Sequence, residues 1–195
     1  MIVGITGGIS TGKSTAAAVI ARQGVKITDC DEISHFLTTY ETSIITAIRE
    51  HFGDRVFHEY GALNRPALAD IVFTDEAEKK ALERILHPPI KAWVRANIDL
   101  AEELEQPLVV VAPLLIEAGM TTDVDKLWVV TCSGENQLKR LCDRAGISEH
   151  TAQTWIDAQM SLNEKEKYAD HVLRNDGSIE DFKTQVGAAW DALVH

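Results

Sequence analysis

Five short apolar runs recur along the chain, and longer stretches with helical spacing of apolar residues separate them. The runs are residues 2–6, 25–28, 108–112, 127–131 and 171–173. Continuous runs rich in Val and Ile are typical of strands that are covered on both faces. Their alternation with helices predicts an α/β fold, a doubly wound and mainly parallel five-stranded sheet whose ligands bind beyond the carboxyl ends of the strands.

A long helical stretch, from about residue 32 to about residue 106, separates the second and third predicted strands. We predict breaks at Gly53, at the pair Tyr60-Gly61 and at the pair Pro88-Pro89, because Gly and Pro disfavour helix interiors. A single crossover helix does not need so many residues. We therefore interpret the stretch as a helical substrate-binding insertion.

A second, polar pair of helices is predicted over about residues 134–167, with a break at 145–148 and Ser148 as an N-cap. Lys139, Arg140 and Arg144 lie near its start, which suits a mobile cationic lid. Residues 178–193 carry apolar side chains at helical spacing, and core packing explains this final helix. The length favours one domain, 1–195, that contains the insertion and the lid.

The first predicted strand runs directly into a phosphate-binding motif. Residues 7–14 read GGISTGKS, which fits the pattern G-x-x-x-x-G-K-[ST]. Its glycines let successive N–H groups converge on phosphate oxygens, and the lysine adds a positive charge near the β- and γ-phosphates. An ordinary glycine-rich turn would not require lysine and serine at these positions. The residues expected to bind ATP here are Gly8, Ser10, Thr11, Gly12, Lys13, Ser14 and Thr15, with the Ser14 hydroxyl as a ligand of Mg²⁺.

The charge balance limits the partners of the chain. With 19 Lys and Arg against 30 Asp and Glu, the formal charge of −11 opposes binding to nucleic acid or to an anionic membrane surface. The three cysteines have no C-x-x-C spacing, so a disulfide framework or a structural zinc site is not expected. No signal peptide or membrane span is evident. We expect a cytoplasmic protein, a monomer or a weak homo-oligomer.

Two aspartates follow the second predicted strand, in the sequence Asp29-Cys30-Asp31. One carboxylate is suited to orient or deprotonate an acceptor hydroxyl, and the other to hold magnesium-bound water or to cap the next helix. The alternative is that both are simply acids at a helix N-terminus, where Asp is common. The residues alone leave both interpretations open.

Phosphoryl transfer also needs positive charge around the equatorial oxygens of the transferred group. Arg140 and Arg144 share one helix face and are candidates, although arginines on a surface helix are often only solvated. The third strand ends without the aspartate that many phosphate-loop proteins use for magnesium. Asp31 and Glu117 are therefore alternative contributors to the metal site. His87 precedes two prolines, and such a histidine more often ends a helix than contacts a ligand.

Together these residues resemble the dephospho-CoA kinase family, whose members phosphorylate the 3′-hydroxyl of the ribose of dephospho-CoA. The resemblance covers nearly the whole chain and rests on an ordered set of motifs rather than on the phosphate loop alone. The matching positions are 6–9 with 12–14, 29–31, 61–65 with Leu68, 72–73, 86–90, 113–115 with Glu117, Gln137 with Arg140, Gln159, and 169–173 with Asn175 and Gly177.

The resemblance implies a role for individual residues. The catalytic base of the family falls on Asp31, its phosphate-loop lysine on Lys13 and its lid arginine on Arg140. His87 and Arg65 become candidates on the acceptor side, and Asn175 and Gly177 border the adenine of ATP. One departure is Val111, which stands where many members carry an acid two residues before the proline of P-L-L, so no metal ligand is assigned there.

Three alternatives remain. Another small-molecule kinase, for shikimate, gluconate or a nucleoside monophosphate, is disfavoured by the long insertion that contains Leu86-His87-Pro88. A regulatory GTPase would need a guanine-recognition signal after the fourth strand, and residues 131–134 offer none. A binding module without catalysis is disfavoured because Lys13, Asp31 and Arg140 are all present.

Overall fold

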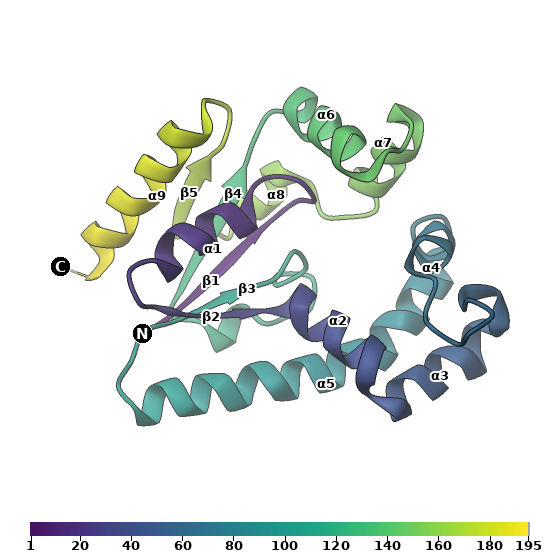
Figure 1. Cartoon of the computed structure of the whole chain (residues 1–195). Coiled ribbons are helices and arrows are strands. Elements are labelled where there is room, and N and C mark those ends of the chain that lie inside the picture. Colours follow the sequence, from purple (N-terminus) through teal and green to yellow (C-terminus); the bar gives the residue numbers. More distant parts are fainter. Residues whose placement is uncertain (195) are drawn as a thin grey trace. The chain divides into compact units, whose positions relative to one another are not determined.

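The computed structural model describes residues 1–194, and these form two compact units (Figure 1). The first unit combines Met1–Asp29 with the chain from Asn97 onward. The second unit is Cys30–Ala96. The first contains the whole sheet, and the second contains helices and one short isolated bridge between Phe57 and Leu63.

The sheet of the first unit has five strands, all parallel, in the order β2-β3-β1-β4-β5. They are β1 (Ile2–Gly7), β2 (Lys26–Asp29), β3 (Leu108–Val111), β4 (Lys126–Thr131) and β5 (His171–Arg174). Each lies on one of the predicted apolar runs, so the strand predictions and the fold class are confirmed. Since the strands are parallel, their carboxyl ends meet at one edge, where the phosphate loop begins.

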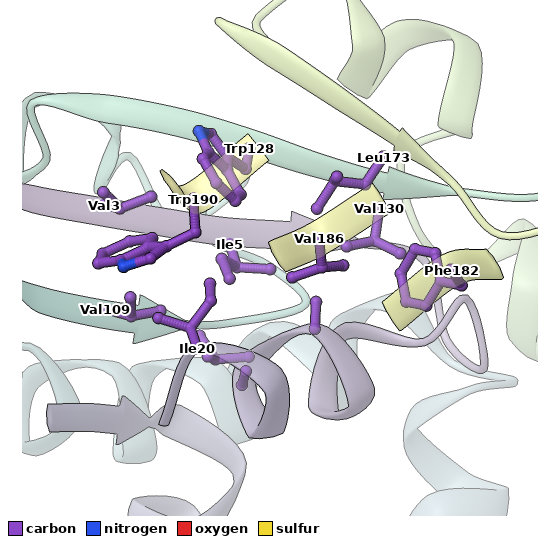
Figure 2. Close-up of a cluster of buried hydrophobic side chains, with 13 residues drawn as sticks. Val3, Ile5, Ile20, Val109, Trp128, Val130, Leu173, Phe182, Val186 and Trp190 are labelled. Atoms are coloured by element: carbon purple, nitrogen blue, oxygen red, sulfur yellow. The ribbon is translucent and has the colours of Figure 1, made fainter. Parts of the chain in front are cut away.

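One face of the sheet carries the main hydrophobic core, covered by α1 (Lys13–Ala21) and α9 (Ile179–Val194). Figure 2 shows that Val3, Ile5 and Val109 point from the strands toward Ile20 of α1 and Trp190 of α9. Trp190 is buried and meets Trp128 edge-on, with ring centroids 6.0 Å apart. The predicted amphipathic C-terminal helix is therefore confirmed as a core element.

The opposite face of the sheet is also buried, because successive side chains along a strand alternate between the two faces. Leu108, Val110 and Val129 have no exposed surface, and α8 (Leu162–Glu166) packs against β4. Burial on both faces explains why the strands are continuous apolar runs rather than alternating ones.

The remaining helices of the first unit have capped ends. In α6 (Gly134–Ala145) the N-cap Ser133 accepts a hydrogen bond from the N–H of Asn136, and in α7 (Glu149–Asp157) Ser148 accepts one from Thr151. Ser148 is therefore the N-cap that the sequence predicts. Ser161 and Glu164 form a capping box at the start of α8. A short 3₁₀ helix, η2 (Thr121–Asp123), precedes β4.

The second unit has a small core of its own. It contains α2 (Cys30–Tyr40), α3 (Thr42–Phe52), η1 (Asp54–Val56), α4 (Arg65–Val72) and most of α5 (Glu76–Glu103). The apolar faces of these helices bury Ile48, Phe52, Val56, Leu68 and Ala81. The predicted break at Gly53 is confirmed, since α3 ends there, and the predicted break at Tyr60-Gly61 falls between η1 and α4.

The predicted break at Pro88-Pro89 is wrong, because α5 continues through both prolines. His87 accordingly lies inside a helix and does not end one. A proline removes its own N–H from the ladder and crowds the carbonyl four residues earlier, but the turns on either side keep their bonds. Buried Leu86 and Val94 flank the prolines, and their packing supports the helix across this point.

Within residues 1–194, every helix is too short or too polar to cross a membrane.

Candidate active site

The phosphate loop connects β1 to α1 and has a backbone that few residues adopt. Gly12 has φ 111°, and a Cβ added to it would lie 2.3 Å from Nδ2 of Asn175. Ser10 has φ 61°, in the left-handed region that non-glycine residues seldom occupy. Such strain persists only where the surroundings determine the conformation, and it is concentrated at binding sites.

Lys13 is the first residue of α1, and its ammonium group lies over the loop. Its Nζ donates to the carbonyl of Gly7 at 3.1 Å and to that of Gly8 at 2.8 Å. Lys13 is buried, whereas Ser14 in the same helical turn is exposed. The loop therefore combines a fixed positive charge, the N-terminal dipole of α1 and an accessible hydroxyl, which is the chemistry that bound phosphate requires.

Asn175, which follows β5 directly, is bonded to the phosphate loop. Its Nδ2 donates to the carbonyl of Thr11 at 2.8 Å, and Thr11 Oγ1 donates to the carbonyl of Gly8 at 2.9 Å. Asn175 is buried, while Gly177 is exposed before the start of α9. The motif that contains both residues is thus tied to the phosphate loop through its asparagine.

Two glutamines to which the sequence assigns no role contact the loop at a single residue. Gln137 of α6 donates from Nε2 to the carbonyl of Ile9 at 3.0 Å, and Gln159 accepts from the N–H of Ile9 at Oε1, at 2.9 Å. Their only sequence signal is their place in the family motifs, because glutamines on polar helices are usually solvated.

Arg140 lies one turn after Gln137 on α6 and is half-buried, whereas Arg144 is exposed. Burial raises the pKa of the nearby Cys132 thiol, and the positive charge of Arg140 opposes that shift. Hydrogen bonds from the Ser133 N–H and the Asn136 side chain lower the pKa of Asp176, and Arg140 adds to this effect.

Two buried side-chain atoms lack a hydrogen-bond partner in the described part of the chain, namely Ser10 Oγ and Arg140 Nη1. Buried polar atoms are normally satisfied, so unsatisfied ones at a phosphate loop and on a neighbouring cationic helix fit groups that bind an anionic ligand.

Glu117, after β3, is paired with a lysine that the sequence did not single out. Nζ of Lys165, on α8, lies 2.7 and 2.8 Å from the two carboxylate oxygens of Glu117 and 2.9 Å from the carbonyl of Pro113. Lys165 is fully buried, and burial lowers its pKa while Glu117 raises it. Because both of its oxygens contact Lys165, Glu117 serves as an ion-pair partner rather than as an open metal ligand.

In residues 1–194 no cluster of three or more His, Cys, Asp or Glu side chains could hold a metal ion. Val111, at the position where the family resemblance leads one to expect an acid, is buried in the core.

The two aspartates of the D-C-D sequence lie on consecutive elements. Asp29 is the last residue of β2, and Asp31 is an exposed residue in the first turn of α2, which starts at Cys30. A carboxylate in the first helical turn is stabilised in its charged form by the helix dipole. Asp31 is therefore accessible from solvent.

Arg65 opens α4 in the second unit and is tied to α2. Its Nη2 donates to Thr38 Oγ1 at 2.7 Å, to Thr39 Oγ1 at 3.0 Å and to the carbonyl of His35 at 3.2 Å. Partial burial lowers the pKa of Arg65, although a guanidinium stays charged at neutral pH. One nitrogen thus fixes the side chain.

His87 is half-buried inside α5, one helical turn from both Glu83 and Lys91. Burial lowers its pKa, Glu83 raises it and Lys91 lowers it further. The ring is therefore neutral at pH 7, and a neutral imidazole offers one hydrogen-bond donor and one acceptor.

A parallel sheet in the order 2-3-1-4-5, with a phosphate loop after β1 and helices on both sides, defines the class of P-loop kinases. The family model for dephospho-CoA kinase matches residues 1–181. The chain belongs to the dephospho-CoA kinase family, and its activity is that of a kinase with a hydroxyl acceptor.

Individual relatives agree with this assignment. The chain is 40% identical over 192 residues to a dephospho-CoA kinase of Symbiobacterium thermophilum, covering 98% of this chain and 80% of that protein. It is 37% identical to one of Gloeobacter violaceus, covering 97% and 91%. The solved structure of a dephospho-CoA kinase from Campylobacter jejuni superposes with a TM-score of 0.70 at 26% identity, covering 98% and 96%.

Proposed function

We propose that the chain transfers the γ-phosphoryl group of magnesium-bound ATP to the 3′-hydroxyl of dephospho-CoA, and that the residues named above carry this reaction. The observation that supports it most is the strained phosphate loop with Lys13 on its carbonyls, in a chain that the family model matches over residues 1–181. The cofactors are accordingly ATP and Mg²⁺.

On the nucleotide side, the N–H groups of the loop from Gly8 to Thr15 bind the phosphates, and Lys13 leaves the loop carbonyls to contact the transferred group. The Ser14 hydroxyl would hold Mg²⁺ together with the nucleotide phosphates, and the ion would supply positive charge that neutralises them. Asn175 and Gly177 border the adenine, and the hydrogen bond from Asn175 to Thr11 couples that border to the loop.

On the acceptor side, Asp31 accepts the proton of the 3′-hydroxyl as its oxygen attacks the γ-phosphorus. The bond between the γ-phosphorus and the bridging oxygen breaks, and ADP leaves with that oxygen. Arg140 compensates the charge that develops on the equatorial oxygens. Arg65 and the neutral His87 bind the acceptor.

The organisation of the chain belongs to the same proposal. We infer one kinase domain, 1–195, in which residues of about 32–106 form the acceptor-binding insertion and residues of about 134–167 form a lid. Its partner is the small-molecule substrate, without nucleic acid or membrane. We infer a cytoplasmic location and a monomer or weak homo-oligomer.

A coupled assay of ADP release across acceptors tests the substrate. Dephospho-CoA is expected to react with magnesium-ATP, whereas AMP, shikimate and gluconate release little ADP. Adenosine, which lacks the diphosphate and pantetheine, is expected to react slowly with a lower kcat as well as a higher KM, because remote binding energy positions the 3′-hydroxyl. Mass spectrometry and ³¹P NMR of the product locate the new phosphate.

The rival is another small-molecule kinase of the same fold. If the protein forms no ADP from ATP in the presence of dephospho-CoA but does so with one of the other acceptors, the proposed substrate is wrong. The assignment to phosphate-loop kinases would still stand. Magnesium removal by EDTA is expected to abolish turnover in either case.

A further inference from the structure

Ile9, in the middle of the phosphate loop, has both of its backbone polar groups bonded to glutamine side chains. Its carbonyl accepts from Gln137 at 3.0 Å and its N–H donates to Gln159 at 2.9 Å. The next residue, Ser10, has the strained φ of 61°. The two bonds therefore fix the backbone that leads directly into the strained residue.

The roles of the two amides are fixed by what they contact. A backbone N–H can only donate and a carbonyl can only accept, so Gln159 must present its oxygen and Gln137 its nitrogen. Gln137 is buried, and a Cβ at Gly8 would lie 2.5 Å from its Nε2. Glycine at position 8 thus allows the amide of Gln137 to approach the loop.

Both glutamines belong to the segment 134–167. Gln137 lies in α6, one turn before Arg140, and Gln159 follows α7. The ion pair between Glu117 and the buried Lys165 lies beside Gln159: the N–H of the adjacent Met160 donates to Glu117 at 3.2 Å, and Glu117 is bound by Lys165. Movement of α6 or of the residues after α7 therefore changes the contacts of Ile9.

We propose that Gln137 and Gln159 are positioning residues, which together clamp the backbone of Ile9 and couple the conformation of the phosphate loop to the segment that carries Arg140. This amide clamp rests on the proposed function, because its role is to hold the phosphate loop and Arg140 in positions where both contact the same phosphoryl group. Neither glutamine needs to touch substrate for this role.

The first test replaces each amide by a side chain of similar length, in Gln137→Met and Gln159→Met. A half-buried backbone group that loses its partner destabilises the clamped loop, so kcat is expected to fall by between about fivefold and a hundredfold, with a smaller change in the KM for dephospho-CoA. Hydrogen exchange of the unliganded protein is expected to speed up at residues 8–12. Gln153→Met is the matched control, since Gln153 is exposed on α7 and its side chain donates to Asp157 on the same helix.

The second test uses Gln→Glu at both positions. Each variant adds one negative charge near the loop, but Gln159→Glu keeps an acceptor for the N–H of Ile9, whereas Gln137→Glu removes the donor to its carbonyl. Gln137→Glu is therefore expected to lose more kcat and more exchange protection than Gln159→Glu.

Equal losses in the two glutamate variants would show an effect of charge alone and overturn the clamp. Exchange and kcat in both methionine variants equal to those of Gln153→Met would also overturn it. Inactivity of the unmodified protein toward dephospho-CoA would instead count against the proposed function, and the exchange measurement would still test the clamp without substrate.

Discussion

The phosphate-loop edge of the first unit and the helices of the second unit fix their candidate residues in different ways. At the loop, contacts join residues distant in sequence, such as Asn175 with Thr11 and Gln159 with Ile9. In the second unit, Arg65 is bonded to a nearby helix and Asp31 lies exposed in a first helical turn. The phosphate-loop site is thus built by the convergence of strand ends, whereas the residues proposed to bind the acceptor are side chains on separate helices.

This difference has a consequence for mutagenesis. A substitution at the loop disturbs a shared network, so its effects on ATP binding and turnover are coupled. For a substitution in the second unit we expect a change in turnover or in acceptor binding and a smaller change in ATP binding.

Asp31→Asn is expected to lower turnover by about 10² to 10⁴, because a general base typically contributes that much. The KM for ATP and the melting temperature should stay close to those of the unmodified protein, since Asp31 is exposed. Steady-state kinetics and thermal unfolding measure both. The paired control is Asp29→Asn, which should lower turnover less, and the reverse order would assign the base to Asp29.

Arg140→Ala is expected to lower kcat by about 10² to 10³ and to change the KM for ATP less, because it acts on charge that develops in the transition state. Arg144→Ala is its matched control on the same helix face, where the side chain is exposed. Unchanged kcat with weaker ATP binding would make Arg140 a ground-state phosphate contact and remove it from the catalytic residues.

The sequence predicts the nucleotide side of this contrast better than the acceptor side. The five strands follow from continuous apolar runs, and the phosphate loop from a motif whose glycines, lysine and serine each have a physical reason. Lys165 could not be found this way, because a lysine on a short polar helix is normally solvated and its burial depends on Glu117, 48 residues away.

Prediction from the sequence is less successful in the second unit for a related reason. Pro88 and Pro89 predict a helix end from local chemistry, yet tertiary packing of the residues around them keeps α5 continuous. Arg65 and His87 sit in helices with no local pattern that separates a ligand contact from a structural bond. Only the family resemblance assigns them to the acceptor, so kinetics must separate the two roles.

Arg65→Ala is expected to raise the KM for dephospho-CoA about tenfold, the effect of losing one charge-assisted hydrogen bond, with the KM for ATP unchanged. Initial rates at varied concentrations of each substrate measure this. Thr38→Val is the matched control, because it removes the shortest bond to Arg65 but keeps the guanidinium. If both variants lose only thermal stability, Arg65 is a structural link between α4 and α2.

His87 is expected to make the free energy of unfolding of the second unit decrease at acidic pH. Burial lowers its pKa in the folded protein below the ordinary value of 6.5, so the unfolded chain binds more protons as pH falls below 6.5. The free energy of unfolding should therefore decline from pH 7 to pH 5, and His87→Gln should reduce that slope, by less than about 1 kcal/mol for a partly solvated ring. Urea unfolding at several pH values measures it, and an unchanged slope would contradict the assignment.

Asp176 is expected to give the first unit a smaller dependence of stability on pH, at lower pH values. Hydrogen bonds from Ser133 and Asn136 lower its pKa in the folded protein below the ordinary 3.8, so its contribution is complete above 3.8 and is lost as pH falls through the lower folded value. Because the carboxylate is exposed, solvent screening limits the effect to about half a kcal/mol or less. Asp176→Asn should therefore be slightly less stable than the unmodified protein at pH 6, and the two should converge near pH 2. A constant difference across that range would mean that the carboxylate acts through packing. Any loss of stability at acidic pH would then come from other acidic residues of the chain.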